Sequence, residues 1–287
     1  MKKNILIVGC GDVGTEAGRR LEQLGHAVYG LKRTVSDKVP FPCVYGDVSD
    51  IDSLSACFKQ LPDEIHYLVY TVAPAERTEI AYHAAYPEGV KNCLACIDAH
   101  ILQGFLLVTS TAVYSQQQGQ WVDELAETAP TSFSGQKLLA AEDVLHSSAV
   151  KGVAVRLGGI YGPGRERLIK KVKNGCEINR AIPAYTNRIH RDDCAGILSY
   201  LIQMIDAGQE VDRCYVGVDS HPVPEWDVLC CIAKLLNVDS PVNNETLSVI
   251  RQNKRCRNNR IRSLGYEFIF DNYEDGYKQL IDFTKEV

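Results

Sequence analysis

An apolar run followed at once by three closely spaced glycines constrains this chain most. The stretch ILIVGCGDVG (residues 5–14) places Gly9, Gly11 and Gly14 in the spacing GxGxxG. Apolar residues then recur at helical spacing through residues 13–24. The stretch therefore predicts a β-strand, a tight turn and an α-helix in direct succession.

Each glycine of this turn has its own expected role. Gly9 can make the tight turn, Gly11 lets the backbone approach a pyrophosphate, and Gly14 lets helix and strand pack closely. The amino end of the following helix favours an anion. We therefore expect a dinucleotide site that includes Asp12 and Val13 as well. The alternative is an ordinary strand-to-helix turn.

Six short, nearly continuous apolar runs alternate with helical segments over the first 160 residues. The runs cover residues 4–9, 27–31, 43–46, 67–72, 105–110 and 152–157. Such runs are typical of parallel strands that are buried on both faces. The alternation predicts βαβ units and an α/β fold with a Rossmann-type, doubly wound parallel sheet.

The pattern loosens after GIYGPG (residues 159–164), where prolines become frequent and the strand rhythm is lost. We expect a smaller C-terminal substrate domain there. The dinucleotide-binding domain is predicted to span 1–160, joined by about 188–220. The substrate domain is then formed by 161–187 and 221–287.

Charge and hydropathy narrow the range of partners. The formal net charge is -5, with 31 Lys and Arg against 36 Asp and Glu. This balance argues against nucleic acid, whose binding depends on surplus cations. No run of apolar residues is long enough to span a bilayer, and the N-terminal run is too short for a secretion signal. We expect a soluble protein with a small-molecule substrate.

The cysteines indicate the redox compartment. Eleven are scattered along the chain, an odd number that suits free thiols in a reducing cytoplasm better than disulfides. Cys93 and Cys96 form a CxxC pair that we interpret as helix packing, because no second CxxC or histidine pair accompanies it. With His190 alone near two aspartates, no metal site is predicted.

The end of the second predicted strand indicates which dinucleotide is preferred. An NAD site usually has an acidic residue about 20 positions after the glycines, to bind the ribose 2'-hydroxyl. This chain has Lys32 there, followed by Arg33. Two cations can pair with a 2'-phosphate, so we expect NADP(H), with NAD(H) as the second choice. The alternative for both residues is a solvated loop.

Further motifs follow in a characteristic order: YGDVSD, TVAP, VTSTAVYS, SGQKLLAAEDVL, VRLGGIYGPG and NRIHRDDCA. In this order they resemble the extended short-chain dehydrogenase/reductases, the NAD-dependent epimerase/dehydratase family. The glycine spacing is similar to that of an atypical branch. The resemblance covers nearly the whole chain.

The resemblance implies a set of site residues. Ser110 would hold the substrate hydroxyl or carbonyl, and Lys137 would bind the nicotinamide ribose. The remaining implied cofactor residues are Asp47, Val48, Thr71, Val72, Ala73, Thr109 and Leu157.

One position departs from the family pattern. A tyrosine usually lies one helical turn before the lysine, but here Phe133 precedes Lys137. Phenylalanine cannot transfer a proton, and a positioned acid or base contributes about 10² to 10⁴ in rate. Phe133 is either a packing residue or the mark of a lost acid. The candidate substitutes are Ser110, Ser134, a water held by Lys137, and a tyrosine such as Tyr185.

The second domain carries the candidate substrate contacts. Arg165 and Arg188 follow the sixth predicted strand and could bind phosphates, since arginine forks suit diphosphates; solvated surface cations are the alternative. Asp192 and Asp193 are expected to cap the next helix, and YEFIF (residues 266–270) to form a late strand.

The resemblance implies an oxidoreductase or epimerase/dehydratase acting on a nucleotide-sugar-like or related small polar substrate. The alternative is an NADP(H)-sensing or scaffold protein without turnover. The helical segments 88–100 and 135–147 also suit a homodimer contact, although either could simply cover its own sheet.

Overall fold

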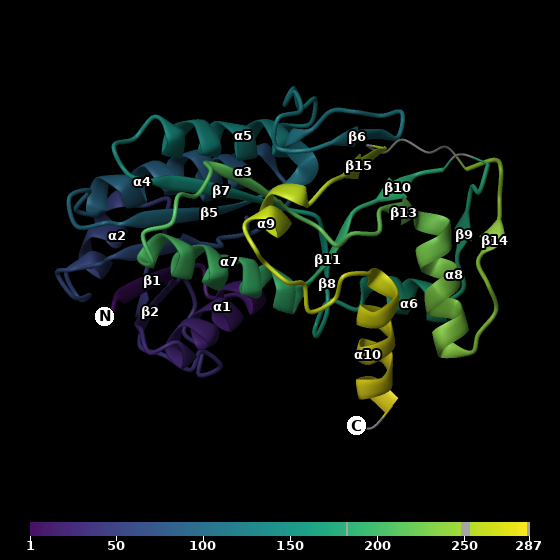
Figure 1. Cartoon of the computed structure of the whole chain (residues 1–287), viewed down its shortest axis with the longest axis horizontal. Coiled ribbons are helices and arrows are strands. Elements are labelled where there is room, and N and C mark those ends of the chain that lie inside the picture. Colours follow the sequence, from purple (N-terminus) through teal and green to yellow (C-terminus); the bar gives the residue numbers. More distant parts are fainter. Residues whose placement is uncertain (182, 248–252, 286–287) are drawn as a thin grey trace. The chain divides into compact units, whose positions relative to one another are not determined.

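The computed structural model of the chain describes residues 1–181, 183–247 and 253–285 (Figure 1). These residues form two compact units. Unit 1 comprises Met1–Val113, Thr128–Arg156 and Cys194–Tyr215. Unit 2 comprises Tyr114–Glu127, Leu157–Asp193 and Val216–Val287.

Unit 1 is built on a seven-stranded sheet with the strand order β12-β7-β5-β4-β1-β2-β3. The strands are β1 (Asn4–Val8), β2 (Ala27–Lys32), β3 (Cys43–Tyr45), β4 (Tyr67–Tyr70), β5 (Gly104–Ser110), β7 (Gly152–Leu157) and β12 (Cys214–Gly217). Strand β1 pairs in parallel with both β2 and β4, with Ile5 opposite Val28 and Tyr67. The chain order therefore reverses at β1, the point where doubly wound sheets bind ligands.

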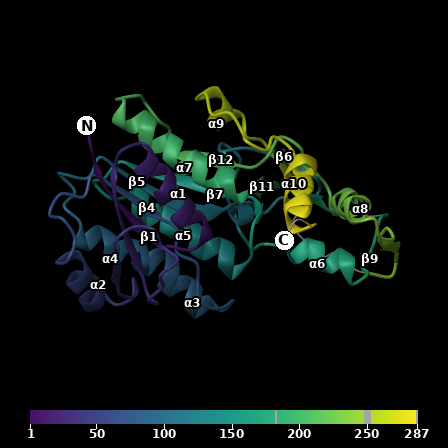
Figure 2. The same cartoon turned by 90° about the horizontal axis from the view of Figure 1, so that it is seen from below.

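Helices cover both faces of this sheet (Figures 1 and 2). Helices α1 (Asp12–Gln23) and α7 (Arg191–Asp206) lie on one face. Helices α2 (Ile51–Phe58), α4 (Gly89–Cys96) and α5 (Phe133–His146) lie on the other. The predicted Rossmann-type α/β fold is confirmed.

Two short segments complete the helical layer next to α5. Helix α3 (Glu79–His83) continues through a π-helical turn, η1 (Ala84–Glu88), into α4. A 3₁₀ turn, η2 (Thr111–Val113), follows β5.

The core of unit 1 explains why its strands are continuous apolar runs. Leu6, Val8 and Leu68 of the sheet pack with Leu54 of α2 and Val90 of α4 in one buried cluster. Because side chains on both sheet faces are covered, alternation with polar residues is absent.

Unit 2 consists of short paired strands and helices. They are β6 (Gln120–Val122), β8 (Gly159–Tyr161), α6 (Arg167–Lys173), β9 (Glu177–Ile178), β10 (Tyr185–Thr186), β11 (Arg188–His190), β13 (Val223–Pro224), α8 (Glu225–Leu236), β14 (Val242–Asn243), β15 (Lys254–Cys256), α9 (Asn259–Ser263) and α10 (Tyr273–Lys285). Ile169, Val228, Ile232 and Ile281 form part of its core, together with Tyr277, whose ring stacks on Tyr161 with centroids 4.5 Å apart.

Four segments that sequence analysis placed in the first domain group with unit 2, namely residues 114–127, 157–160, 188–193 and 216–220. Residues 114–127 do so because they contain β6, which pairs in parallel with β15. Residues 188–193 do so because they contain β11, which pairs with β8. Each of these two strands belongs to the same unit as the strand with which it pairs, although the partner is distant in the sequence.

The predicted strand at residues 266–270 is wrong, because this segment is irregular. The backbone N–H groups of Ile269 and Phe270 donate to the carboxylate of Asp193, at 2.8 and 3.0 Å. The hydroxyl of Tyr266 donates to it at 2.9 Å. Asp193 lies inside the first turn of α7, not before the helix as expected, and its fully buried carboxylate binds the groups that a strand partner would have bound.

Candidate functional site

The glycine turn is interlocked with the segment that follows β4. Gly9 has a φ of +94°, in the region that favours glycine. A Cβ at Gly9 would lie 2.6 Å from the backbone nitrogen of Val72. A Cβ at Gly14 would collide with the carbonyl of Gly9 and the hydroxyl of Thr71, which donates to that carbonyl at 2.6 Å. Side chains are therefore excluded at both glycines by packing alone.

Gly11 has a different environment. It is exposed, and a Cβ placed there would meet no protein atom within 4 Å. It is the N-cap of α1 and provides no side chain to accept hydrogen bonds from the first turn. Because the first N–H groups of an α-helix lack intrahelical acceptors, this open end suits a diphosphate. The residues present fit the bridging phosphates of a dinucleotide.

The carboxyl ends of β2 and β3 carry the predicted charges of the adenosine end. Lys32 ends β2 and Arg33 follows, with Arg33 Nη1 3.8 Å from Asp47 Oδ2. Asp47 Oδ1 accepts hydrogen bonds from the backbone and hydroxyl of Ser49, at 2.9 and 2.8 Å. Asp47 is thereby oriented, and Arg33 lies beside it at the same sheet edge as Gly11, because parallel neighbours end together.

The other predicted cofactor positions beyond β3 and β4 differ in exposure. Val48 is buried, and its carbonyl accepts a hydrogen bond from the Asn92 amide at 2.9 Å. Thr71 and Val72 are half-buried against the glycine turn, and Ala73 is exposed. The Val48 side chain is therefore part of the packed interior, whereas residues 71–73 after β4 are partly accessible to solvent.

Thr109 and Ser110 both end β5 but lie in different surroundings. The buried Thr109 hydroxyl donates to Glu142 Oε1 at 2.7 Å. Glu142 in turn forms a buried ion pair with Arg156, 2.6 Å between Oε2 and Nη2. The half-buried Ser110 hydroxyl accepts a hydrogen bond from the Ala112 N–H at 3.2 Å. Thr109 thus belongs to an internal network, and Ser110 has the more accessible hydroxyl.

Helix α5 begins next to the end of β5. Ser132 is its N-cap and accepts a hydrogen bond from the Gly135 N–H at 3.2 Å. A Cβ at Gly135 would collide with the carbonyl of Ala112, so the first turn of α5 packs directly on η2. This close packing holds Phe133 and Lys137, one helical turn apart, at the carboxyl end of β5.

Helix α3 adds two residues that sequence analysis missed. Lys137 Nζ lies 2.9 Å from Glu79 Oε1. The Phe133 ring meets the Tyr82 ring edge to face, with centroids 5.4 Å apart and planes at 87°. The stretch EIAYHAAY contains a signal, since it places Glu79 and Tyr82 three residues apart on one helical face. Nothing local indicates which helix that face contacts.

The predicted residues of unit 2 differ in exposure. Leu157 is 1% exposed, and Arg165 lies on an exposed turn. Arg188 is half-buried, and among the residues described its Nε has no hydrogen-bond partner. Burial raises the pKa of Asp219 to about 8, and the nearby Arg188 charge opposes this rise. The Arg188 charge therefore favours the ionised form of Asp219.

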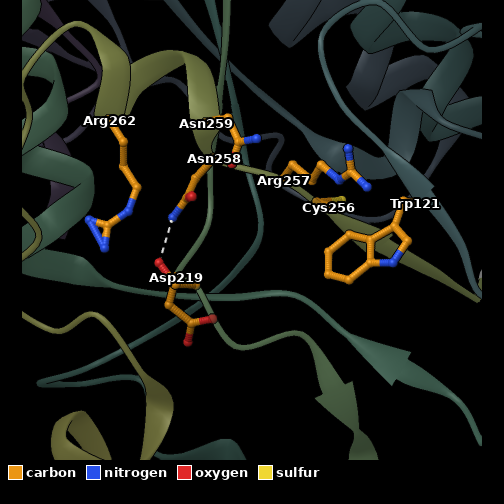
Figure 3. Close-up of a pocket in the computed structure, with 8 residues that line it drawn as sticks. Trp121, Asp219, Cys256, Arg257, Asn258, Asn259 and Arg262 are labelled. Atoms are coloured by element: carbon orange, nitrogen blue, oxygen red, sulfur yellow. Dashed lines mark hydrogen bonds between the residues drawn. The ribbon is translucent and has the colours of Figure 1, made fainter.

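Unit 2 also has a polar hollow of about 340 Å³ (Figure 3). Its lining includes Trp121, Arg257 and Asn258, and the Arg257 guanidinium lies 5.1 Å from the Trp121 ring centroid. The Asn258 amide donates to Ser220 Oγ at 3.1 Å, the bond drawn in Figure 3. None of the predicted site residues lines this hollow.

Cys93, Cys96 and His190 lie among packed side chains. Cys93 is fully buried in α4, and Cys96 Sγ lies 3.6 Å from Ser55 Oγ. His190 is buried between aromatic rings, 5.2 Å from Tyr161 and 4.2 Å from Phe270 between centroids. In the part of the chain that the structure describes, no three His, Cys, Asp or Glu residues are grouped as metal ligands. Within the same residues, no helix combines the length and apolar character needed to cross a membrane.

Sequence comparison identifies the family. The profile of the NAD dependent epimerase/dehydratase family matches residues 5–217. The chain belongs to this family. No curated protein matches the sequence.

Solved structures agree with membership of the NAD-dependent epimerase/dehydratase family. A Methylobacillus flagellatus protein, provisionally described as an NAD-dependent epimerase/dehydratase, is 34% identical. The match covers 99% of this chain and 100% of that one, with a TM-score of 0.84.

Two enzymes with lower identity share the fold. The UDP-glucose 4-epimerase of Thermotoga maritima, solved with UDP-glucose, is 15% identical over 99% of both chains, with a TM-score of 0.82. The dTDP-glucose 4,6-dehydratase of Bacillus anthracis, solved with NAD, is 14% identical over 99% of this chain and 97% of that one, with a TM-score of 0.79.

Proposed function

We propose that this member of the NAD-dependent epimerase/dehydratase family is an NADP(H)-dependent oxidoreductase or epimerase/dehydratase. Its substrate is a nucleotide-linked sugar or a related small polar compound. The observation that carries the proposal is the convergence of Gly11, Arg33, Thr71 and Ser110 at the carboxyl ends of neighbouring strands. The UDP-glucose and NAD bound by proteins of the same fold support a nucleotide-linked sugar and a nicotinamide dinucleotide as ligands, without favouring NADP(H) over NAD(H).

The chain's own residues would divide the work of binding. The amino end of α1 at Gly11 binds the bridging phosphates, and Lys32 and Arg33 bind the 2'-phosphate of the adenosine ribose. Lys137 binds the nicotinamide ribose, and Ser110 orients the reacting hydroxyl or carbonyl of the substrate. When bound, the nicotinamide supplies a hydride acceptor or donor.

The preference for NADP(H) rests on charge at the end of β2. Lys32 and Arg33 place two cations where an NAD site usually has a carboxylate. Arg33 Nη1 lies 3.8 Å from Asp47 Oδ2, so the guanidinium is near the carboxyl end of β3. A dianionic 2'-phosphate gains from both cations, whereas a neutral 2'-hydroxyl gains little.

An NADP(H)-sensing or scaffold protein without turnover is the second candidate. It is favoured by Phe133, which has no proton to transfer and whose ring packs on Tyr82. This candidate predicts tight cofactor binding that changes partner affinity, with no change in the nicotinamide when substrates are added.

One experiment separates the two candidates. NADPH and NADH are first titrated by fluorescence. In separate samples that contain NADP⁺ or NAD⁺, UDP-glucose, UDP-N-acetylglucosamine and dTDP-glucose are then added while reduced-nicotinamide fluorescence and product NMR are followed. An enzyme gives saturable conversion that Lys137→Ala abolishes and the surface control Lys173→Ala preserves. Tight binding without conversion, unchanged by Lys137→Ala, would instead support the sensing candidate.

A further inference from the structure

Helices α3 and α5 meet through two matched contacts. Glu79 and Tyr82 are three residues apart on α3, and Phe133 and Lys137 are four apart on α5, so each pair lies on one helical face. Glu79 Oε1 lies 2.9 Å from Lys137 Nζ, and the Tyr82 ring meets the Phe133 ring edge to face. A phenol from another helix is therefore packed against the position where the family resemblance places a tyrosine.

The ion pair marks the alignment of the two helices more than it adds stability. Glu79 is 62% exposed at its side chain and Lys137 24%, and ion pairs so exposed add little to stability. The ion pair and the Tyr82–Phe133 ring contact occur together, in the same register between the two helices.

The backbone around Tyr82 is anchored on both sides. Thr78 caps α3 by accepting a hydrogen bond from the Ala81 N–H at 3.3 Å. After Tyr82 the chain enters the π-helical turn η1, whose Ala85 carbonyl accepts the hydroxyl of Tyr70 at 2.5 Å. π-Helical turns are rare and occur frequently at functional sites. Tyr82 is thus held in place by contacts that do not use its own hydroxyl.

The neighbouring phenols are less suited to proton transfer. Tyr70 is fully buried and bonded to Ala85. Burial, with Tyr82 nearby, raises the pKa of Tyr86 well above its ordinary value. Tyr82 is half-buried, and its hydroxyl forms no hydrogen bond with residues 1–181, 183–247 or 253–285. Tyr86 is also half-buried, but its ring pairs with Tyr82, at 5.6 Å between centroids, whereas Tyr82 pairs with Phe133.

We infer that Tyr82 is the proton-transferring phenol of this chain and replaces the tyrosine absent at position 133. This inference rests on the proposed function. In alcohol oxidation the substrate O–H bond breaks and its proton passes to the Tyr82 phenolate. The C–H bond gives its hydrogen and electron pair to the oxidised nicotinamide of NADP, leaving a carbonyl. In the reverse direction the Tyr82 O–H returns the proton.

The first test removes only one oxygen atom. Tyr82→Phe keeps the ring packed on Phe133, and Tyr86→Phe is the matched control from the same segment. With UDP-glucose as the probe, Tyr82→Phe should lower kcat by about 10² or more, with KM and NADPH affinity within threefold. Tyr86→Phe should stay within threefold of wild type. Adding Phe133→Tyr to Tyr82→Phe should recover at least tenfold in kcat.

The second test does not depend on turnover. Protein labelled with 3-fluorotyrosine is followed by ¹⁹F NMR, with resonances assigned from Tyr82→Phe and from Tyr67→Phe, a buried phenol at the start of β4. Saturation with NADP⁺ and UDP-glucose should shift the Tyr82 resonance and leave that of Tyr67 in place.

The outcomes distinguish this inference from the proposed function. If wild type is active and Tyr82→Phe is equally active, the Tyr82 assignment alone is overturned. A Tyr82 resonance that does not shift when the ligands are added also overturns it. Wild type that binds NADPH but converts none of the probes overturns the proposed function, and the Tyr82 assignment with it.

Discussion

Replacing Gly11 by alanine should separate folding from cofactor binding. The backbone of Gly11, with φ −79° and ψ −163°, is one that alanine adopts without strain, and its Cβ would meet no protein atom within 4 Å. Gly→Ala at a compatible position stabilises by about 0.4 to 1 kcal/mol through the unfolded state. Alanine is also a poorer N-cap than glycine, by roughly 0.5 to 1 kcal/mol. These effects nearly cancel, so stability should change by less than about 1 kcal/mol.

The same methyl group should weaken dinucleotide binding. It would occupy the space in which the backbone of the turn approaches the bridging phosphates. We expect NADPH affinity to fall at least tenfold, which corresponds to about 1.4 kcal/mol. Urea unfolding measures the stability of Gly11→Ala, and fluorescence titration measures its affinity for NADPH.

Gly14→Ala provides the contrast. Its Cβ would collide with the carbonyl of Gly9 and the hydroxyl of Thr71, so overpacking should cost about 1 to 3 kcal/mol of stability and impair binding as well. The reasoning is refuted if Gly11→Ala binds NADPH as tightly as wild type, or if it loses as much stability as Gly14→Ala.

Three further changes test charge and burial. Arg33→Ala should lower NADPH affinity about tenfold while NADH affinity stays within twofold, because only the 2'-phosphate needs the guanidinium; titration with both dinucleotides checks this. Burial raises the folded pKa of Asp219 to about 8, so the unfolding free energy should fall as pH rises from about 4 to 8, by at most roughly 1 kcal/mol per pH unit from this group. Asp219→Asn should remove that part of the slope in urea melts, and an unchanged slope would contradict it. Glu142→Ala leaves Arg156 buried without its carboxylate and should cost about 3 to 5 kcal/mol in urea unfolding, against less than about 0.5 for the exposed neighbour Asp143→Ala.

The sheet was predictable because its strands are buried on both faces. The six apolar runs correspond to β1, β2, β3, β4, β5 and β7, with ends shifted by two residues at most. The seventh strand, β12, is only four residues long and fully buried. So short an apolar run does not differ from a helix fragment in its pattern, which is why it was not predicted.

Secondary structure and domain membership were predicted wrongly where hydrogen bonds connect residues that are distant in the sequence. YEFIF has the β-branched and aromatic composition of a strand, yet its backbone N–H groups are taken by the Asp193 carboxylate, more than 70 residues earlier. Likewise, β6 groups with unit 2 because its partner is β15. Composition predicts that a segment can pair, but not with which group.

The same limit applies to the candidate site. Spacing along α5 identifies Phe133 and Lys137 as a pair on one face, and spacing along α3 does so for Glu79 and Tyr82. Which faces meet is decided by nonlocal packing, which includes the close approach of Gly135 in α5 to the Ala112 carbonyl. Sequence analysis of the missing acid proposed Ser110 and Ser134, which are weak acids, a water held by Lys137, and Tyr185 of the second domain, but not Tyr82. In the structure, the phenol of Tyr82 in α3, some 50 residues earlier in the chain, contacts the ring of Phe133, which has no hydroxyl.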